Sequence, residues 1–351
     1  MTVPSFGMRP GSFPRALACL LLATLAACGS RPPSPAPVVP DATGTMTSAP
    51  PIRIGIALGG GAAKGFAHIG VIKMLEANGF APSVVAGTSA GSVVGALYAS
   101  GMNAFELQEK AVALDDARIR DLQLSSGGLV LGQKLDDYVN EQVRRKPLEQ
   151  LAKPFVAVAT RLEDGERTVF ARGNTGQAVR ASSSVPGVFQ PVTIGKYHYV
   201  DGGIVSPVPV DAARQLGADV VVAVDISNKA RGQTPSHLLG ALNQSIAIMC
   251  QKLGQAELAR ADITIRPQVL DMGPADFTQR ASAIVEGEKA ALAVMPQLRE
   301  RVAKLQAERA QALRQAQQKA AEAEHKACLE NRSRLQKLAG TVGLDGSCER
   351  P

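Results

Sequence analysis

The sequence has no tryptophan and only four tyrosines, and aromatic residues make up 4% of its 351 residues. Nucleic-acid-binding proteins usually cluster basic residues together with aromatic ones. Here 38 lysines and arginines are dispersed along the chain against 31 acidic residues, and the formal net charge is +7. This mild excess argues against a nucleic-acid partner and is compatible with attraction to an anionic lipid surface.

Cysteine is also scarce, with five residues in the whole chain. Their spacing fits no metal site, so we predict no metal ligands. Cys19 lies in a segment that we expect to be removed, and we expect Cys250 to be a buried apolar residue. Cys328 and Cys348 are candidates for a disulfide if the protein is exported to an oxidising compartment.

The apolar stretch near the N-terminus, residues 16–27, is too short to span a bilayer as a mature helix. Arg9 and Arg15 precede it, a pattern that predicts an export signal over residues 1–27. The signal ends in Leu25-Ala26-Ala27-Cys28, which resembles the lipobox of bacterial lipoproteins. An ordinary secretory signal with a chance cysteine is the alternative.

The lipobox resemblance implies that Cys28 becomes an acylated N-terminus that anchors the protein to a membrane. Gly29 and Ser30 follow it with no aspartate, and resemblance to Gram-negative lipoproteins then implies the outer membrane, facing the periplasm. Residues 28–51 are dominated by proline, serine, alanine and threonine, and this composition cannot bury enough apolar surface to fold alone. We therefore predict a tether there.

The pattern after the tether predicts a parallel α/β domain over residues 52–294. An apolar run, Ile52–Leu58, ends at three glycines and is followed by a helical pattern over Phe66–Asn78 and a second apolar run at Ser83–Ala86. Asp219–Ile226 is apolar throughout, which is typical of a strand in a sheet covered on both faces. Together these segments predict a three-layer α/β/α domain with a mainly parallel sheet.

Residues 295–351 are rich in alanine, glutamine, lysine, arginine and glutamate. Leu298, Val302 and Leu305 share one helical stripe before the apolar pattern weakens. We predict a long polar C-terminal helix that is solvated or self-pairing, with a membrane-surface helix as the alternative.

The first chemical motif is Gly87-Thr88-Ser89-Ala90-Gly91, a G-x-S-x-G pattern between an apolar strand and a helix. This context indicates a nucleophile elbow, in which a sharp strand-to-helix turn exposes the Ser89 hydroxyl and the helix N-terminus favours developing negative charge. Without the context, the motif would often be a plain turn.

The second motif is the glycine loop Gly59–Gly65, whose glycines leave backbone N–H groups unobstructed at a helix start. A P-loop would need Gly-Lys-Ser/Thr, but Lys64 precedes Gly65, and the Rossmann spacing is not met. An oxyanion hole remains, with the amides of Gly59, Gly60 and Gly61 as predicted donors.

The third motif is Tyr199-Val200-Asp201-Gly202-Gly203, a strand-like segment that ends in a carboxylate. If Asp201 lies beside Ser89, it can remove the hydroxyl proton as a general base. Alone, Asp-Gly-Gly would be a turn.

Histidines offer a poorer base. Strand alternation points His198 away from Asp201, while His68 lies on the helix after the glycine loop and we expect it to support the site from behind. His237 falls in a loop-like stretch and His325 in the polar tail. We therefore prefer a Ser–Asp dyad to a histidine-containing triad.

These three motifs, in this order, resemble the patatin-like phospholipase family over Ile52–Ile226. The resemblance implies a Ser89–Asp201 dyad on an α/β/α fold, and Ala181–Pro191 is similar to the family's Ser/Pro-containing segment. Ala62 stands where many members have a further glycine, which leaves open which amides form the oxyanion hole.

Lys64 matches the basic residue of the family's glycine loop and is expected to orient the loop or meet a lipid phosphate, with surface solvation as the alternative. The implied function is a serine acyl-ester hydrolase of the phospholipase A or lysophospholipase type, acting on membrane lipids in lipid catabolism without metal or cofactor. A histidine-dependent hydrolase and a non-enzymatic lipid-binding or scaffold lipoprotein stay open as alternatives.

Overall fold

The computed structural model describes residues 49–115, 130–227 and 238–339. The chain divides into two units, residues 1–46 and 47–351, and the first lies outside the described residues. Predictions for the export signal, for Cys28 and most of the tether, for His237 and for the pairing of Cys328 with Cys348 therefore involve residues outside the described part.

The described residues form a mixed sheet in the order β5-β6-β3-β2-β1-β7-β8, with β4 also paired to β3. Strands β3, β2, β1, β7 and β8 run parallel, whereas β4, β5 and β6 are antiparallel to their neighbours. The strands are β1 (Ile54–Leu58), β2 (Val84–Thr88), β3 (Phe155–Arg161), β4 (Arg167–Phe170), β5 (Val192–Ile194), β6 (Tyr197–Asp201), β7 (Val220–Val224) and β8 (Ile263–Ile265).

Both faces of the sheet are covered by helices, as strand β7 shows. Val220, Val222 and Val224 belong to a cluster shared with helices α1, α2 and α8, while Val221 and Ala223 belong to a second cluster shared with α6 and α7. The helices are α1 (Phe66–Ala77), α2 (Ala90–Ala99), α3 (Ala104–Ala113), α4 (Gln133–Gln142), α5 (Thr175–Ser182), α6 (Val210–Gln215), α7 (Leu238–Leu258) and α8 (Arg280–Ala339). The predicted α/β/α architecture with its long C-terminal helix is confirmed.

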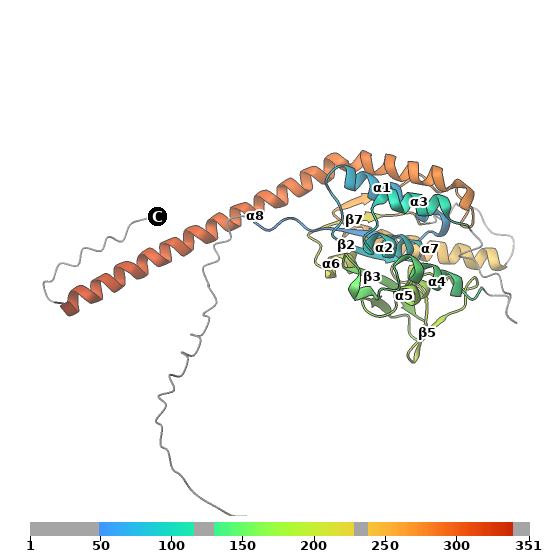
Figure 1. Cartoon of the computed structure of the whole chain (residues 1–351), viewed down its shortest axis with the longest axis horizontal. Helices are drawn as coiled ribbons and strands as arrows, with labels where there is room; N and C mark the ends of the chain where they lie inside the picture. The colour runs from blue at the N-terminus through green and yellow to red at the C-terminus, as the bar shows by residue number, and fades with distance from the viewer. Residues whose placement is uncertain (1–48, 116–129, 228–237, 340–351) are drawn as a thin grey trace, which may run out of the picture. The chain divides into compact units, whose positions relative to one another are not determined.

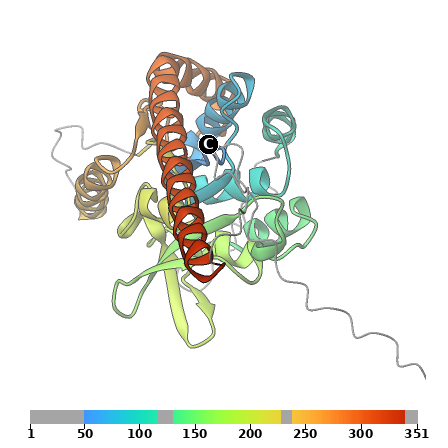
Figure 2. The same cartoon turned by 90° about the vertical axis from the view of Figure 1, so that its left-hand side faces the viewer.

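Helix α8 begins at Arg280, earlier than the change of composition at Met295 indicated. Its first turns pack along α1, and Figures 1 and 2 both show the two helices side by side. The crossing is close because it lies at glycines: a Cβ on Gly70 would come 1.9 Å from the Ile284 carbonyl oxygen. Residues 280–294 are as apolar as the rest of the domain core, unlike the polar residues that follow them. The change in composition at Met295 therefore does not mark the start of the helix.

The predicted stripe on α8 is buried at Leu298 and Val302, whereas most side chains beyond Arg309 are exposed. Within the described residues, no helix combines the length and the apolar character needed to cross a membrane.

Candidate active site

Ser89 sits in a strained turn between β2 and α2, with φ 53° and ψ −123°. The two motif glycines explain how the turn packs. A Cβ on Gly87 would lie 2.5 Å from the carbonyl oxygen of Gly91, and one on Gly91 would lie 2.1 Å from that of Leu58. Only glycine fits at either position. Because both residues lack a side chain, the turn can pack closely against strand β1 while it holds Ser89. Positive φ in a non-glycine residue marks strain of the kind found at functional sites.

A buried serine that sequence reasoning did not single out holds this turn. The Ser89 amide donates a hydrogen bond to Ser182 Oγ at 2.9 Å, and Ser182 Oγ in turn donates to the Val158 carbonyl at 2.6 Å. Ser182 is fully buried at the end of α5. It therefore ties the elbow to strand β3, a link between segments far apart in sequence.

Asp201 is brought to Ser89 by the sheet itself. Strands β2 and β6 both pair with β3, and their last residues, Thr88 and Asp201, lie level with the consecutive residues Val158 and Ala159. The carboxyl ends of the two strands therefore reach one place on β3, and the residue after Thr88 is Ser89. The structure thus brings together the two residues predicted for the dyad.

The Asp201 carboxylate is buried, and only one of its two oxygens has a regular hydrogen-bond partner. Oδ1 accepts a hydrogen bond from the Gly203 amide at 2.7 Å, whereas Oδ2 has no partner of regular hydrogen-bond geometry within the described residues. Burial raises the pKa of Asp201 to about 6, although hydrogen bonding to the Ser89 hydroxyl and the Gly203 amide lowers it. A carboxylate with this pKa near neutrality is suited to accept and return a proton.

The glycine loop lies against the nucleophile, since a Cβ on Gly60 would be 3.2 Å from Ser89 Cβ. Two of its three predicted donors are already engaged, because the Gly59 amide donates to the Val224 carbonyl and the Gly60 amide to the Pro207 carbonyl, each at 3.0 Å. The expectation that both amides face an oxyanion is therefore revised.

The next two amides of the loop, those of Gly61 and Ala62, have no hydrogen-bond partner in the described part of the chain. Ala62 has a positive φ of 53°, the conformation for which a glycine would be preferred. The amides available to an oxyanion are therefore those of Gly61 and Ala62, one to two residues later in the loop than Gly59 and Gly60.

The two basic residues of the loop region, Lys64 and His68, are both buried. Lys64 is only 1% exposed, so the solvated alternative is wrong, and its contact with a lipid phosphate stays a prediction. His68 donates from Nε2 to the Gly59 carbonyl at 2.8 Å, and burial lowers its pKa to about 4. This neutral histidine supports the glycine loop from behind, as expected.

The remaining described histidines lie elsewhere. His198 is exposed and pairs through Nδ1 with Glu163 at 2.8 Å. Within residues 49–115, 130–227 and 238–339, no histidine hydrogen-bonds to Ser89 or Asp201. The same ranges contain no group of His, Cys, Asp or Glu side chains arranged to hold a metal ion.

Helix α7 packs against the segment that follows Asp201. No sequence motif predicted this contact. Cys250, expected to be a buried apolar residue, is half-buried and its Sγ lies 3.1 Å from the Gly203 carbonyl oxygen. Burial raises the pKa of its thiol to about 11, so it stays protonated.

About two turns further on, Glu257 accepts hydrogen bonds from Ser206 Oγ and, at 2.8 Å, from the Val208 amide. The Ser206 carbonyl accepts from Thr88 Oγ1 at 2.8 Å. Glu257 therefore fixes the segment Ser206–Val208, which contacts both the strand before Ser89 and the glycine loop.

A model of the patatin-like phospholipase family matches residues 56–214. An uncharacterized NTE family protein of Mycobacterium tuberculosis is 36% identical over 182 residues, which are 51% of this chain and 51% of that protein. Patatin-like phospholipase domain-containing protein 6 of Homo sapiens is 32% identical over 184 residues, 50% of this chain and 13% of that protein.

Lysophospholipase NTE1 of Pyricularia oryzae is 27% identical over 279 residues, 70% of this chain and 19% of that protein. The chain thus spans about half the length of the mycobacterial relative and far less of the other two. The matched segment contains the glycine loop, the Ser89 elbow and Asp201. Residues 56–214 of this chain therefore match the patatin-like phospholipase family.

Proposed function

We propose that this protein is a serine acyl-ester hydrolase that acts on lipids through a Ser89–Asp201 dyad. The observation that carries the proposal is the meeting of two strand ends on β3, which sets a strained serine beside a buried carboxylate with a raised pKa. No described histidine hydrogen-bonds to either residue, and a carboxylate can perform the proton transfer alone.

In the proposed reaction, the ionised Asp201 removes the Ser89 proton as Oγ attacks the ester carbonyl carbon. The carbonyl oxygen becomes an oxyanion, for which Gly61 and Ala62 offer open amides. The amide of Ala90, the first residue of α2, is a third donor because a helix start leaves its N–H groups without intrahelical partners. Each well-placed donor is worth about 3 kcal/mol in the transition state.

Collapse of this intermediate breaks the ester bond, and Asp201 returns its proton to the departing alcohol. The acyl-enzyme is then hydrolysed by water, with Asp201 again as the base. The cycle requires no metal and no cofactor.

A lipid substrate is supported by apolar side chains exposed around the dyad. Ile248 and Met249 are 44% and 54% exposed, directly before Cys250. Val185 and Val188 are also exposed, next to Ser184, whose carbonyl accepts the Asp201 amide at 2.9 Å. Exposed apolar groups beside residues that contact the Asp201 segment suit an acyl chain, and two relatives are named for phospholipase or lysophospholipase activity.

The lipobox-like sequence extends the proposal to location. An acylated Cys28 would hold the domain at the outer membrane, facing the periplasm, on a proline-rich tether. Anchorage would raise the local concentration of lipid substrate around the dyad.

The test is hydrolysis of a labelled phospholipid, a lysophospholipid and a chain-length series of chromogenic esters by residues 45–351. We expect release of fatty acid that is lost in Ser89→Ala and Asp201→Asn, while His198→Ala, with its exposed ring, retains it. Equal background from the parent and both dyad variants would contradict the proposal and favour a binding or scaffold role.

A further inference from the structure

The strand register places a second polar site in line with the dyad. Gly87, Leu58, Val224 and Ile265 lie level across β2, β1, β7 and β8. These strands are parallel, so the residues that follow them gather at one edge of the sheet. Ligands of open parallel sheets bind at this carboxyl edge, at the point where strand order reverses, here between β1 and β7.

Two charged residues follow the outer strands at this edge. Asp225 comes directly after β7 and Arg266 directly after β8. With neighbouring strands about 4.8 Å apart, they lie two and three strand spacings from β2, or about 10 and 14 Å. A lipid whose ester carbonyl reaches Ser89 could therefore extend its polar end toward them.

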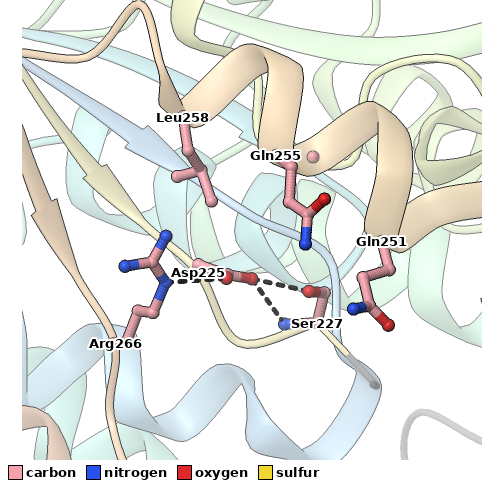
Figure 3. Close-up of a pocket in the computed structure, with 7 residues that line it drawn as sticks. Asp225, Ser227, Gln251, Gln255, Leu258 and Arg266 are labelled. Atoms are coloured by element: carbon pink, nitrogen blue, oxygen red, sulfur yellow. Dashed lines mark hydrogen bonds and ion pairs between the residues drawn. The ribbon is translucent and has the colours of Figure 1, made fainter. Parts of the chain in front are cut away.

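Asp225 and Arg266 line a pocket of about 210 Å³ that helix α7 covers (Figure 3). The other lining residues are Ser227, Gln251, Gly254, Gln255 and Leu258. The volume is below the 300–1,000 Å³ of pockets that hold whole drug-sized ligands, so it suits a headgroup rather than an entire lipid.

The hydrogen bonds inside the pocket leave donors available to a ligand. Asp225 Oδ1 accepts from the amide and, at 2.6 Å, from the hydroxyl of Ser227, and Oδ2 lies 3.4 Å from Arg266 Nε. The carboxylate is thus satisfied and orients the guanidinium. In the described part of the chain, neither terminal amino group of Arg266 has a partner, nor does the side-chain amide of Gln255. Figure 3 shows the Gln255 amide directed toward Asp225 and Ser227, with the Arg266 guanidinium on the other side of the Asp225 carboxylate.

Helix α7 joins this pocket to the dyad. Cys250 and Glu257 contact the segment that follows Asp201, as described above. Gln255 and Leu258 lie on the adjacent stripe of the same helix and face the pocket. The two sites are therefore neighbours under one helix.

We infer that this pocket is a subsite for a phospholipid headgroup, with Arg266 and Gln255 donating hydrogen bonds to its phosphodiester. Before ligand binding, the Asp225–Arg266 pair gives the pocket no net charge. A zwitterionic head, whose phosphate meets the arginine while its cationic end extends toward solvent, matches this charge better than a dianion such as free phosphate. The inference rests on the proposed function and names the substrate class that the dyad would receive.

The test measures binding without catalysis, by calorimetry on Ser89→Ala protein. Two ligands share one acyl chain and are used below their micellar concentrations: a lysophosphatidylcholine and the matching monoacylglycerol. We expect the lysophospholipid to bind about tenfold more tightly, since a half-exposed arginine is partly screened. Adding Arg266→Met should remove this preference, and adding Gln255→Met, an exposed helix position, should reduce it.

Arg214→Met is the matched control. Arg214 is 40% exposed and pairs with Asp262, whereas Arg266 is 51% exposed and pairs with Asp225, and both aspartates are 8% exposed. Arg214 approaches the opposite, amino end of β7 and β8, so its substitution should leave the preference intact.

Equal affinity for the two lipids, or equal losses in Arg214→Met and Arg266→Met, would overturn the subsite. Inorganic phosphate is titrated separately, and Arg266-dependent phosphate binding without lipid preference would identify a free-anion site and overturn the headgroup assignment. If the lipid preference is present while the parent protein hydrolyses none of its substrates, the subsite stands and the proposed function alone fails.

Discussion

At the scale of single residues, Asp201 faces opposing demands from stability and chemistry. Its burial makes ionisation unfavourable and raises its pKa from 3.8 to about 6, yet the proposed base must be ionised. A group whose pKa is raised in the folded state stabilises the fold below its unfolded value, and that contribution is lost as pH rises through the folded value. Above about pH 6, the carboxylate therefore lowers the stability of the protein.

Replacing Asp201 by Asn should separate these two effects. We expect the rise of kcat/KM through about pH 6 to disappear with the activity. At pH 8 the variant should unfold with a free energy about 3 kcal/mol higher than the parent, because no buried charge remains. Denaturant unfolding at pH 8 and pH 4 checks this, and a variant less stable at pH 8 than the parent would contradict the burial argument.

Ser182→Ala should damage the elbow without touching the substrate. It leaves the Ser89 amide and the Val158 carbonyl without their partner, and such losses cost about 1–3 kcal/mol. We expect kcat to fall about tenfold with little change in KM, measured on a soluble ester.

Ser183→Ala is the matched control for this serine. The Ser183 hydroxyl is buried beside it but has no hydrogen-bond partner in the described residues, so its removal should be nearly neutral. Equal effects of the two substitutions would show that Ser182 acts only by filling space.

Site residues that stand in a short sequence motif could be predicted. Residues whose role depends on a partner far away in the sequence could not. The serine and aspartate each stand in a short motif with a strand beside it. The glycine-loop donors were assigned wrongly in part because Gly59 and Gly60 are engaged by Val224 and Pro207, which no local pattern connects to the loop. The role of Ser182 was missed for the same reason.

At the scale of elements, helix α7 holds the segment Ser206–Val208 in place through Glu257. Burial raises the pKa of Glu257 to about 7, while Ser206, Val208 and the charges of Arg260 and Arg167 lower it. The ionised form accepts from both donors of the segment Ser206–Val208, so these two hydrogen bonds are strongest above about pH 7, whereas ionisation of the buried carboxyl lowers the stability of the fold as a whole.

Glu257→Gln should therefore lower kcat several-fold, because the amide offers one acceptor where two donors converge. The parent pH profile should contain two ionisations, near 6 and 7, and the variant only the lower one. Glu300→Gln on the exposed face of α8 is the control. A variant profile that keeps both ionisations would contradict the assignment to Glu257.

The elements themselves were predictable where their periodicity was strong. The strands before the glycine loop and before Ser89, and helix α1, lie close to their predicted ranges. Helix α8 was placed too late because its first turns are apolar like the core. The contacts of α7 could not be foreseen, since a half-buried Cys250 and a buried Glu257 carry no sequence signal of their own.

At the scale of the whole molecule, anchorage and self-association remain predictions. Cys28→Ser should shift the protein from the membrane fraction to the soluble periplasmic fraction and abolish incorporation of labelled palmitate. Fractionation of cells that express the full chain checks this. Unchanged membrane association without label would show that the cysteine is not the anchor.

Truncation after residue 315 should spare folding and hydrolysis. It retains Arg309, which contacts the Pro51 carbonyl and Asp219, and removes a part of α8 whose side chains are mostly exposed. Sedimentation velocity should show a smaller assembly if the helix self-pairs, as predicted. An unchanged assembly state would contradict self-association through this helix, and lost hydrolysis would show that the distal helix serves the catalytic domain.

The layered architecture was predictable because alternation and continuous apolar runs reflect burial on one or both faces of a strand. Strand order was not, since pairing of β3 with both β2 and β6 depends on contacts between distant segments. The proximity of Ser89 and Asp201 rests on that pairing.

The central claim is that Ser89 is a nucleophile activated by Asp201, and covalent labelling tests it most directly. The full chain is incubated with a fluorophosphonate at pH 8 and the labelled peptide is identified by mass spectrometry, beside Asp201→Asn and Ser89→Ala. The account predicts one label, on Ser89, formed far more slowly in Asp201→Asn and absent from Ser89→Ala. A label on another residue, or equal labelling rates in the parent and Asp201→Asn, would contradict it.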